Sequence, residues 1–444
     1  MVIFFLSYNL LIFVGSQRLF KLAGVNSWKS LIPIYNIVKH LEIINRPKWW
    51  VILVFIPVIN LLMIPVIWVE FIKRFNHNSK LDRVLVIITL GLYLFYVSYV
   101  SKRTKYVDNI SFSNFERSLG SLVFAVVIAT IVHNYILQPF VIPTGSLEKT
   151  LRVGDFLLVS KFHYGARIPS TVISFPMVHD TIPILKTRSY LKKPQLPYIR
   201  IPGFQEIKNN DIVVFNWPAD TVRKFFVKEK GVIKPRDKKS NYVKRAIGVP
   251  GDSLEIKDGI VYLNGQENKL PERAKPLYTY KIFSKDGVSS SKLKNLEIDG
   301  FIRKFIIRNL SQESYNSLKA NILSISNTNE NEYLIYTDDQ GIPIKKVREL
   351  NIDIREIIDN ERELSLTFND ANKIRNSNEF DTIFRSIEKT NYMNSVFFPG
   401  NKRFNWNNDQ LGPIYIPKAG EKIKLTIDDL PLYKKIIRDY ENNE

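Results

Sequence analysis

Cysteine is absent from the 444 residues of this chain. Disulfide bonds, thiolate nucleophiles and sulfur-ligated metal sites are therefore excluded. Histidine is scarce, and its five residues are His40, His77, His133, His163 and His179. None of them stands in an HExxH or Gly-x-Ser-x-Gly setting, and we find no other pattern typical of metal ligands. We therefore expect no hydrolytic metal, no histidine-based triad and no cofactor.

The charge balance is strongly basic, with 63 lysine and arginine residues against 43 aspartate and glutamate residues. The resulting formal net charge of +20 could serve nucleic acid or anionic lipid. The basic residues are scattered and are not clustered with aromatic residues, which argues against nucleic-acid binding. We attribute the bias toward lysine, asparagine and isoleucine to the nucleotide composition of the genome.

Apolar runs are concentrated before about residue 140, whereas the rest of the chain is polar and punctuated by glycine and proline. This asymmetry predicts a membrane part followed by a part in water. Four segments are predicted to span the membrane: Met1 to about Val14, Trp49 to Ile72, Leu81 to Val100, and Leu119 to Phe140. Pro57, Asn60 and Pro65 interrupt the second segment and favour a kinked span. A re-entrant loop there, with three spans in total, is the alternative.

The basic residues set the predicted orientation. The stretch 102–105 follows the third segment, so this end is expected to face the cytoplasm. The fourth span then ends on the outer face and leaves Ser146 outside. The same topology places Lys73 and Arg74 outside, against the usual bias of basic residues toward the cytoplasm. We predict a membrane module at 1–117 with about three spans, followed by a transmembrane helix at 118–141.

Short strands are predicted after the membrane part. The clearest signal is Asp258-Gly259, which separates the alternating runs 254–257 and 260–263 and predicts a β-hairpin. Further strands are predicted at 156–159 and 212–215. We expect a mainly β outer domain made of residues 142–274 and 391–444.

Two regions do not fit a minimal β domain. They are the proline-rich region 165–208 and the polar region 275–390. Loops this long are uncommon without structure of their own. We predict that 275–390 is an inserted α+β subdomain, with helices within 352–362 and 370–390.

A serine lies just beyond the fourth apolar segment, in the run Pro143-Thr144-Gly145-Ser146. Pro143 restricts the backbone, Gly145 allows a tight turn, and Thr144 supplies a second hydroxyl near Ser146. Taken alone, a serine in such a place is more often part of a turn. Its neighbours indicate an exposed side chain with hydrogen-bond donors beside it.

A lysine, Lys244, lies far downstream in a mostly apolar run from Tyr242 to Val249. Burial in a strand there would disfavour the ammonium form. Lowering a lysine pKa from about 10.4 to about 7 takes about 4 kcal/mol, which apolar burial can supply. A neutral Lys244 could accept the proton of the Ser146 hydroxyl and activate it. Taken alone, a lysine is more often solvated.

Four segments in this order resemble bacterial type I signal peptidase of the S26 family. That family consists of membrane-bound serine-lysine endopeptidases that remove signal peptides from exported proteins. The segments run from Pro143 to Leu151, from Gly154 to Phe162, from Lys244 to Asp252 and from Gly400 to Pro417. The resemblance implies a signal-peptidase-like β fold for the outer domain.

The resemblance also implies roles for individual residues. Ser146 is the nucleophile, and Lys244 is the general base that later protonates the leaving amine. Thr144 donates its hydroxyl to the oxyanion together with the backbone N–H of Ser146, and Arg245 is structural. Small pockets for alanine-like residues before the cleavage site are expected to be lined by Phe140, Ile142, Pro143, Leu151, Tyr242 and Val243. Ordinary core positions are the alternative for these six.

Some positions depart from the family pattern. Leu147 replaces a methionine, which conserves volume, and Lys149 replaces a common proline, which is expected to loosen the turn after the nucleophile. Residues 400–402 stand where Gly-Asp-Asn is common, and 405–409 stand where a serine and an aspartate support the lysine. Asn405 is the predicted support of Lys244.

The sequence therefore predicts a serine peptidase that cleaves N-terminal signal peptides from exported pre-proteins. The resemblance places it in the bacterial cytoplasmic (inner) membrane as a multi-pass protein, with the catalytic domain on the periplasmic face. Its implied partners are membrane-anchored pre-proteins, the lipid bilayer and the protein-translocation machinery. One alternative is a catalytically inactive scaffold, motivated by the altered last segment. Another is a self-cleaving Ser-Lys peptidase, against which an outer active site argues.

Overall fold

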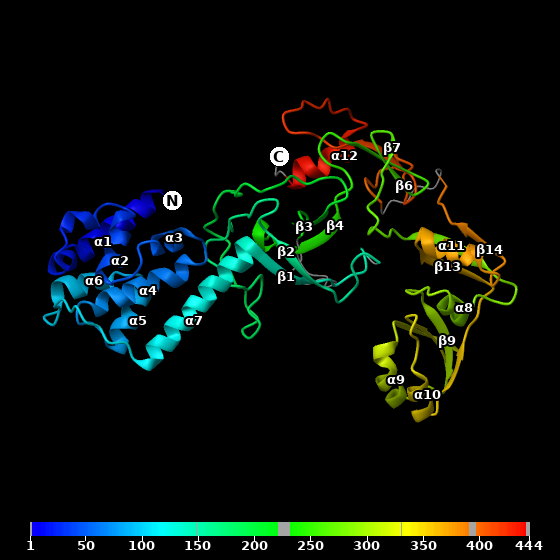
Figure 1. Ribbon diagram of the computed structural model, residues 1–444, viewed down its shortest axis with the longest axis horizontal. Helices are drawn as coiled ribbons and strands as arrows, with labels where there is room; N and C mark the ends of the chain where they lie inside the picture. Colours follow the sequence, from blue (N-terminus) through cyan, green and yellow to red (C-terminus); the bar gives the residue numbers. More distant parts are fainter. Residues whose placement is uncertain (1, 148, 221–230, 330, 390–396, 441–444) are drawn as a thin grey trace. The chain divides into compact units, whose positions relative to one another are not determined.

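The computed structural model describes residues 2–147, 149–220, 231–329, 331–389 and 397–440 (Figure 1). The chain divides into two compact units. The first unit comprises Met1–Val141, Phe156–Ile207 and Val213–Val243, and the second comprises Ile142–Asp155, Lys208–Ile212 and Lys244–Glu444. Met1 and the predicted domain boundary between 390 and 391 lie outside the described residues.

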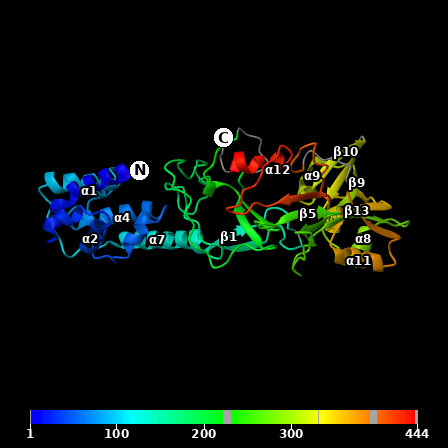
Figure 2. The same cartoon turned by 90° about the horizontal axis from the view of Figure 1, so that it is seen from above.

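The first unit begins with a group of helices that lie side by side in both views (Figures 1 and 2). Most of them share a core in which Phe20, Phe71 and Phe75 are fully buried, whereas Val127, in the last long helix, belongs to a second cluster with Leu53 and Ile59. The helical segments are α1 (Val2–Leu22), η1 (Ser27–Ser30), α2 (Tyr35–Ile43), α3 (Trp50–Phe55), α4 (Asn60–Lys73), α5 (Lys80–Ile88), α6 (Tyr93–Phe95), η2 (Tyr96–Val100), α7 (Asn114–Ile131) and η3 (Val132–Ile136).

Within the described part of the chain, one helix is long and apolar enough to cross a membrane. It extends over 23 residues from Asn114 to Ile136 and corresponds to the fourth predicted span. Its start is defined by a capping box, in which the Ser113 side chain accepts from the Glu116 N–H and the Glu116 carboxylate accepts from the Ser113 N–H. The larger number of spans expected from the sequence is not confirmed.

The second and third predicted spans are each broken. Helix α3 ends at Phe55 and α4 begins at Asn60, with Pro57 in the break. Helix α5 ends at Ile88 and α6 begins at Tyr93. Gly91 lies in the second break with a φ of +84°, and a Cβ there would meet the Trp68 ring at 2.9 Å. A positive φ and this close approach both require glycine.

Ion pairs join the two ends of each broken segment. Arg46, which precedes α3, donates two hydrogen bonds to Glu70 near the end of α4, at 2.6 and 2.7 Å. Arg103, which follows η2, donates to Asp82 near the start of α5 at 2.6 Å. Both segments therefore fold back on themselves, because residues from their opposite ends lie in contact.

Lys73 and Arg74 are buried in this unit. The Lys73 amine donates to the Glu116 carboxylate at 2.7 Å, and the Arg74 guanidinium donates to the carbonyl of Asp108. The sequence prediction placed Lys73 and Arg74 across the membrane from residues 102–117, and these contacts disagree with it. The reason is the helix breaks, which return the chain where the prediction assumed a continuous crossing.

The segments between η3 and the predicted hairpin have little regular structure. Strand β1 (Leu137–Val141) pairs antiparallel with β2 (Phe156–Ser160). A two-stranded sheet contains β3 (Ile212–Asn216) and β4 (Asn241–Arg245), and the short helical segment η4 spans Arg236–Lys238. The proline-rich region 165–208 forms isolated antiparallel bridges, which are Arg167↔Arg200, Thr171↔Gln195, Ser174↔Tyr190 and Thr181↔Arg188.

The second unit contains the predicted hairpin. Strands β5 (Ser253–Lys257) and β6 (Ile260–Leu263) pair antiparallel. Asp258 and Gly259 join them with positive φ values of 49° and 73°, as a tight two-residue turn requires. This prediction is confirmed. The sheet is completed by β15 (Leu411–Tyr415) beside β5 and β7 (Gln266–Glu267) beside β6, and α12 (Leu430–Lys435) and η6 (Ile436–Tyr440) follow.

The inserted region contains both sheets and helices. One sheet has the order β13 (Glu361–Leu366), β8 (Tyr278–Phe283), β14 (Thr382–Arg385), and the other has the order β10 (Ser324–Asn329), β11 (Glu332–Thr337), β9 (Arg303–Arg308), β12 (Asp353–Glu356). The helical segments are α8 (Ser290–Asn295), α9 (Gln312–Leu318), η5 (Lys319–Asn321), α10 (Ile344–Glu349) and α11 (Phe368–Asn376). Each sheet has its own buried cluster.

The helix expected within 352–362 is wrong, because β12 and the start of β13 occupy that stretch. Ile352 and Ile354 alternate with polar residues and pack on the core of the β9 sheet, which is the period of a strand. Within 370–390, helix α11 ends at Asn376 and β14 follows. The described residues thus form mostly small antiparallel sheets with helices, and a mainly β outer domain stays a prediction.

We expect Ile307→Ala to destabilise the inserted region by about 3 kcal/mol, because the Ile307 side chain is fully buried between β11 and β12 and its removal leaves a cavity. Hydrogen–deuterium exchange of β9 and β11 in the full chain should become faster. Ile302→Ala is the matched control, since Ile302 is 53% exposed. Equal exchange in the two variants would contradict this description of the core.

Candidate active site

Ser146 and Lys244 lie together in the second unit, although 98 positions separate them in the sequence. The Lys244 amine donates a hydrogen bond to the Ser146 hydroxyl. Ser146 lies on the exposed segment after β1, and Lys244 belongs to strand β4. The structure therefore brings the predicted nucleophile and the predicted base into direct contact.

The segment that carries Ser146 closes on itself through backbone hydrogen bonds. The Ile142 N–H donates to the Asp155 carbonyl at 3.0 Å, and the Gly154 N–H donates to the Ile142 carbonyl at 2.9 Å. The buried Ile142 side chain holds the base of this loop. The Leu147 carbonyl accepts from the N–H of Leu151 at 2.7 Å. Ser146 is therefore presented by a closed loop.

Lys149 connects this loop to the inserted region. Its side chain is only 15% exposed and forms an ion pair with Asp299. Its φ is +67°, which proline cannot adopt because its ring fixes φ near −65°. Lys149, which stands where the family commonly has a proline, therefore adopts a turn that proline could not form. The ion pair with Asp299 holds this turn. The sequence contained no signal for a partner 150 residues away.

The segment after Lys244 is held by two asparagines that the sequence analysis missed. The Arg245 guanidinium donates to the Asn210 carbonyl at 2.8 Å, and its structural role stays a prediction. The Asn209 amide donates to the Ile247 carbonyl at 2.9 Å and to Asp252 at 2.8 Å. The Asn-Asn-Asp run that precedes β3 was the available signal, because such residues favour turns.

Asp252 closes the glycine-rich turn after β4. Its carboxylate accepts from the Val249 N–H at 2.9 Å, from Asn209 and from Asn264. These hydrogen bonds, led by that of Val249, lower the pKa of Asp252 below its usual value. Its stabilising contribution is therefore present above the unfolded-state pKa of about 4 and is lost as the pH falls through the folded-state value.

Lys244 is half-buried, which is less than the sequence predicted. The physical reason is that its amine reaches the Ser146 hydroxyl, which lies on an exposed loop, so the end of the Lys244 side chain stays near the surface.

The other predicted polar residues lie as follows. Thr144 is exposed on the same loop as Ser146. Asn405 is exposed, and the described hydrogen bonds include none between it and Lys244. Asn407 is buried instead, where it accepts from the N–H groups of Asp409 and Gln410 at 2.9 Å each. The roles of Thr144 and Asn405 stay predictions.

The six apolar residues predicted to line the substrate pockets fall into both units. Phe140, Tyr242 and Val243 belong to the first unit, and Ile142, Pro143 and Leu151 belong to the second. The Tyr242 ring packs against Trp217 with 5.2 Å between the ring centroids. Their role in binding a substrate stays a prediction.

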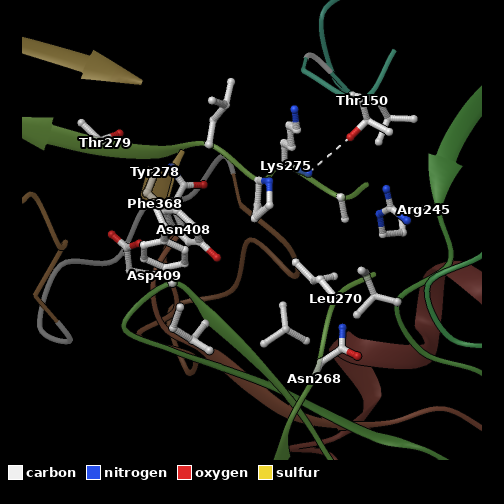
Figure 3. A pocket seen from close by; sticks show the side chains of 18 of the residues that line it. Thr150, Arg245, Asn268, Leu270, Lys275, Tyr278, Thr279, Phe368, Asn408 and Asp409 are labelled. Carbon is white, nitrogen blue, oxygen red and sulfur yellow. Dashed lines mark hydrogen bonds between the residues drawn. The ribbon is translucent and has the colours of Figure 1, made fainter. Parts of the chain in front are cut away.

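A cavity of about 1100 Å³ opens beside Ser146 within the second unit (Figure 3). Gly145, Ser146, Leu147 and Thr150 line it at the loop. The β5–β6 hairpin, the segment 267–274 that follows β6, the region 275–390, and Arg245, Ile247, Asn408 and Asp409 supply the rest of its lining. In the described part of the chain, we find no group of three or more His, Asp or Glu residues that could hold a metal ion.

Two family models match the chain. Residues 116–325 match the family described as signal peptidase, peptidase S26. Residues 28–109 match a family of unknown function, DUF5684. The second match lies inside the predicted membrane module at 1–117. It includes neither Ser146 nor Lys244.

The chain is also similar to individual signal peptidases. It is 31% identical over 175 residues to signal peptidase I of Rickettsia massiliae (strain Mtu5), which covers 39% of this chain and 50% of that protein. It is 30% identical over 188 residues to signal peptidase I of Rickettsia prowazekii (strain Madrid E), which covers 42% and 56%. The chain thus spans about half the length of these relatives. No solved structure was found to match it. Residues 116–325 of the chain are thus similar to the type I signal peptidases of family S26.

Proposed function

We propose that this protein is a signal peptidase that cleaves N-terminal signal peptides from exported pre-proteins by acyl transfer. The observation that carries the proposal is the hydrogen bond between the Lys244 amine and the Ser146 hydroxyl. A nucleophile within hydrogen-bond reach of its base is the arrangement that covalent catalysis requires. The same contact argues against an inactive scaffold.

The first half of the proposed reaction forms an acyl-enzyme. A neutral Lys244 accepts the proton of Ser146, and Oγ attacks the carbonyl carbon of the scissile peptide bond. The Thr144 hydroxyl and the Ser146 N–H donate to the oxyanion that develops. The tetrahedral intermediate then breaks the C–N bond, and Lys244 gives its proton to the departing amine of the mature chain.

The second half releases the signal peptide. Lys244 accepts a proton from water, the hydroxide attacks the Ser146 ester, and Lys244 returns the proton to Oγ. A bound substrate supports this cycle by covering the half-buried lysine, because desolvation favours its neutral form. Alanine-like side chains before the cut would rest on the six apolar residues named above, with Asn405 as a further proposed support of Lys244.

The place of the serine along the chain fits a substrate held in the membrane. The apolar helix ends at Ile136, strand β1 follows to Val141, and Ser146 comes five residues later. A signal peptide in the same bilayer is then already near the nucleophile, which replaces a diffusive search. Exported pre-proteins are the proposed substrates, and the lipid bilayer and the protein-translocation machinery are the proposed partners.

The proposed location is the inner membrane, with the catalytic domain on the periplasmic face. In this topology α7 crosses and the predicted first span, Met1 to about Val14, is kept as a further crossing, whereas the broken segments α3–α4 and α5–η2 return to the side where they began. The ion pairs Arg46–Glu70 and Lys73–Glu116 support it. Lys73 and Arg74 then join the stretch 102–105 on the cytoplasmic side, which satisfies the positive-inside bias.

Ser146→Ala and Lys244→Ala are each expected to lower kcat/KM for a pre-protein substrate by roughly 10³-fold or more, since each removes one half of a unit that acts together. Lys244→Arg should be equally inactive, because arginine keeps its proton. Lys424→Ala, at an exposed position, is the matched control. Purified protein with a pre-protein gives the measurement, and retained cleavage in either alanine variant would overturn the mechanism.

Thr144→Val should lower kcat about 10²-fold with little change in KM, because it removes one oxyanion donor at nearly constant volume. Thr144→Ser, which keeps the hydroxyl, should retain most of the activity. Steady-state kinetics on one peptide substrate separates kcat from KM. A valine variant as active as the serine variant would exclude the oxyanion role.

The absence of cysteine allows the topology to be tested with single cysteines. Lys80→Cys and Lys102→Cys should react with a membrane-impermeant maleimide only from the cytoplasmic side, and Val153→Cys only from the periplasmic side. All three positions are exposed in the structure. If Lys80→Cys instead reacted from the periplasmic side together with Val153→Cys, the four-span topology would be correct.

A further inference from the structure

We propose that the inserted region 275–390 forms the active-site wall on the leaving-group side, and that Tyr278 and Phe368 bind an aromatic side chain near the start of the mature chain. This inference rests on the proposed function, because it assigns the part of the substrate that follows the cut. It gives the insertion a role in substrate selection.

The cavity reaches the nucleophile without the residues proposed to bind the signal peptide. Its lining includes Gly145, Ser146 and Thr150, whereas the three proposed signal-peptide contacts of the same unit, Ile142, Pro143 and Leu151, are not among its lining residues. The part of the substrate that those contacts leave unbound is the part that follows the cut. The cavity therefore suits the residues after the cut, and its volume of about 1100 Å³ exceeds that of most small-molecule pockets.

The inserted region contacts the same turn that carries the nucleophile. Asp299 pairs with Lys149, three residues after Ser146. The Lys275 N–H donates to the Thr150 hydroxyl, which in turn donates to the carbonyl of Arg273, each at 3.5 Å (Figure 3). These contacts hold the wall of the cavity in a fixed relation to Ser146.

An aromatic pair offers the most selective surface in this cavity. The rings of Tyr278, on β8, and Phe368, at the start of α11, lie with 4.6 Å between their centroids (Figure 3). Phe368 remains 47% exposed and lies outside the buried core of its sheet. An apolar ring left exposed in a cavity has free surface for a second ring, and aromatic pairs are favoured beyond their buried area.

The charged groups around the pair favour an apolar occupant over a charged one. The Arg385 guanidinium stacks over the Tyr278 ring at 5.4 Å and donates to the Asp258 carbonyl. Glu363 pairs with Lys281 at 3.4 Å. Acidic and basic side chains both line the cavity. Since neither positive nor negative charge dominates the lining, the cavity does not select a charged side chain of one sign. We therefore assign the selectivity to the aromatic contact.

The test uses peptide substrates that share one signal-peptide segment and differ after the cut. One has alanine at each of the first six mature positions, and in the others a single phenylalanine replaces alanine at each position in turn. At one position, phenylalanine should raise kcat/KM about fivefold for the wild-type protein. Phe368→Ala should abolish this preference, and Phe368→Leu should keep part of it.

Phe384→Ala is the matched control, because Phe384 is 53% exposed in the same region and does not line the cavity. It should keep the full preference. Hydrogen–deuterium exchange of β13 and β14 checks that each variant is folded. If the wild-type protein cleaved none of the peptides, the proposed function itself would be contradicted. Cleavage without a preference, or a preference that survives in folded Phe368→Ala, would overturn this inference alone.

Discussion

The proposed activity depends on one hydrogen bond, between the Lys244 amine and the Ser146 hydroxyl. Neither group is reactive alone, because a serine hydroxyl needs a base and a lysine is normally protonated. Each is held by its own local network. The Ile142–Asp155 bonds close the loop of Ser146, and Asp252 closes the turn after Lys244. The contact therefore joins two locally ordered segments through the Lys244 side chain.

The segments before α7 show how charge and helix breaks together determine the fold of a helical module. Breaks at Pro57 and Gly91 divide two apolar runs into shorter helices. Arg46 and Arg103 then pair with acidic residues from the opposite ends of those runs. Judged by the length of its apolar run alone, each of the two segments would be predicted to cross the membrane. The ion pairs instead hold the two ends of each segment together. The match of residues 28–109 to a separate family fits a module with its own fold.

The features that the sequence predicted correctly are local ones. The Asp258-Gly259 hairpin follows from two residues and the alternation beside them. The contact between Ser146 and Lys244 was expected because the surrounding motifs are recognisable. The Lys149–Asp299 pair and the cavity lined by Phe368 depend on an insertion that packs back on the loop, and no local pattern encodes that. The strand at 353–356 was missed because a short alternating run was taken for a helix.

The central claim is that Ser146 forms a covalent acyl-enzyme with the signal-peptide side of the substrate. Mass spectrometry of the protein and of its proteolytic fragments tests it most directly, after reaction with an activated ester of a peptide that ends in alanine and a rapid acid quench. The account predicts the added mass of the acyl group on the fragment that contains Ser146, and no adduct in Lys244→Ala. An adduct on another residue, or hydrolysis of the ester without any adduct on Ser146, would contradict it.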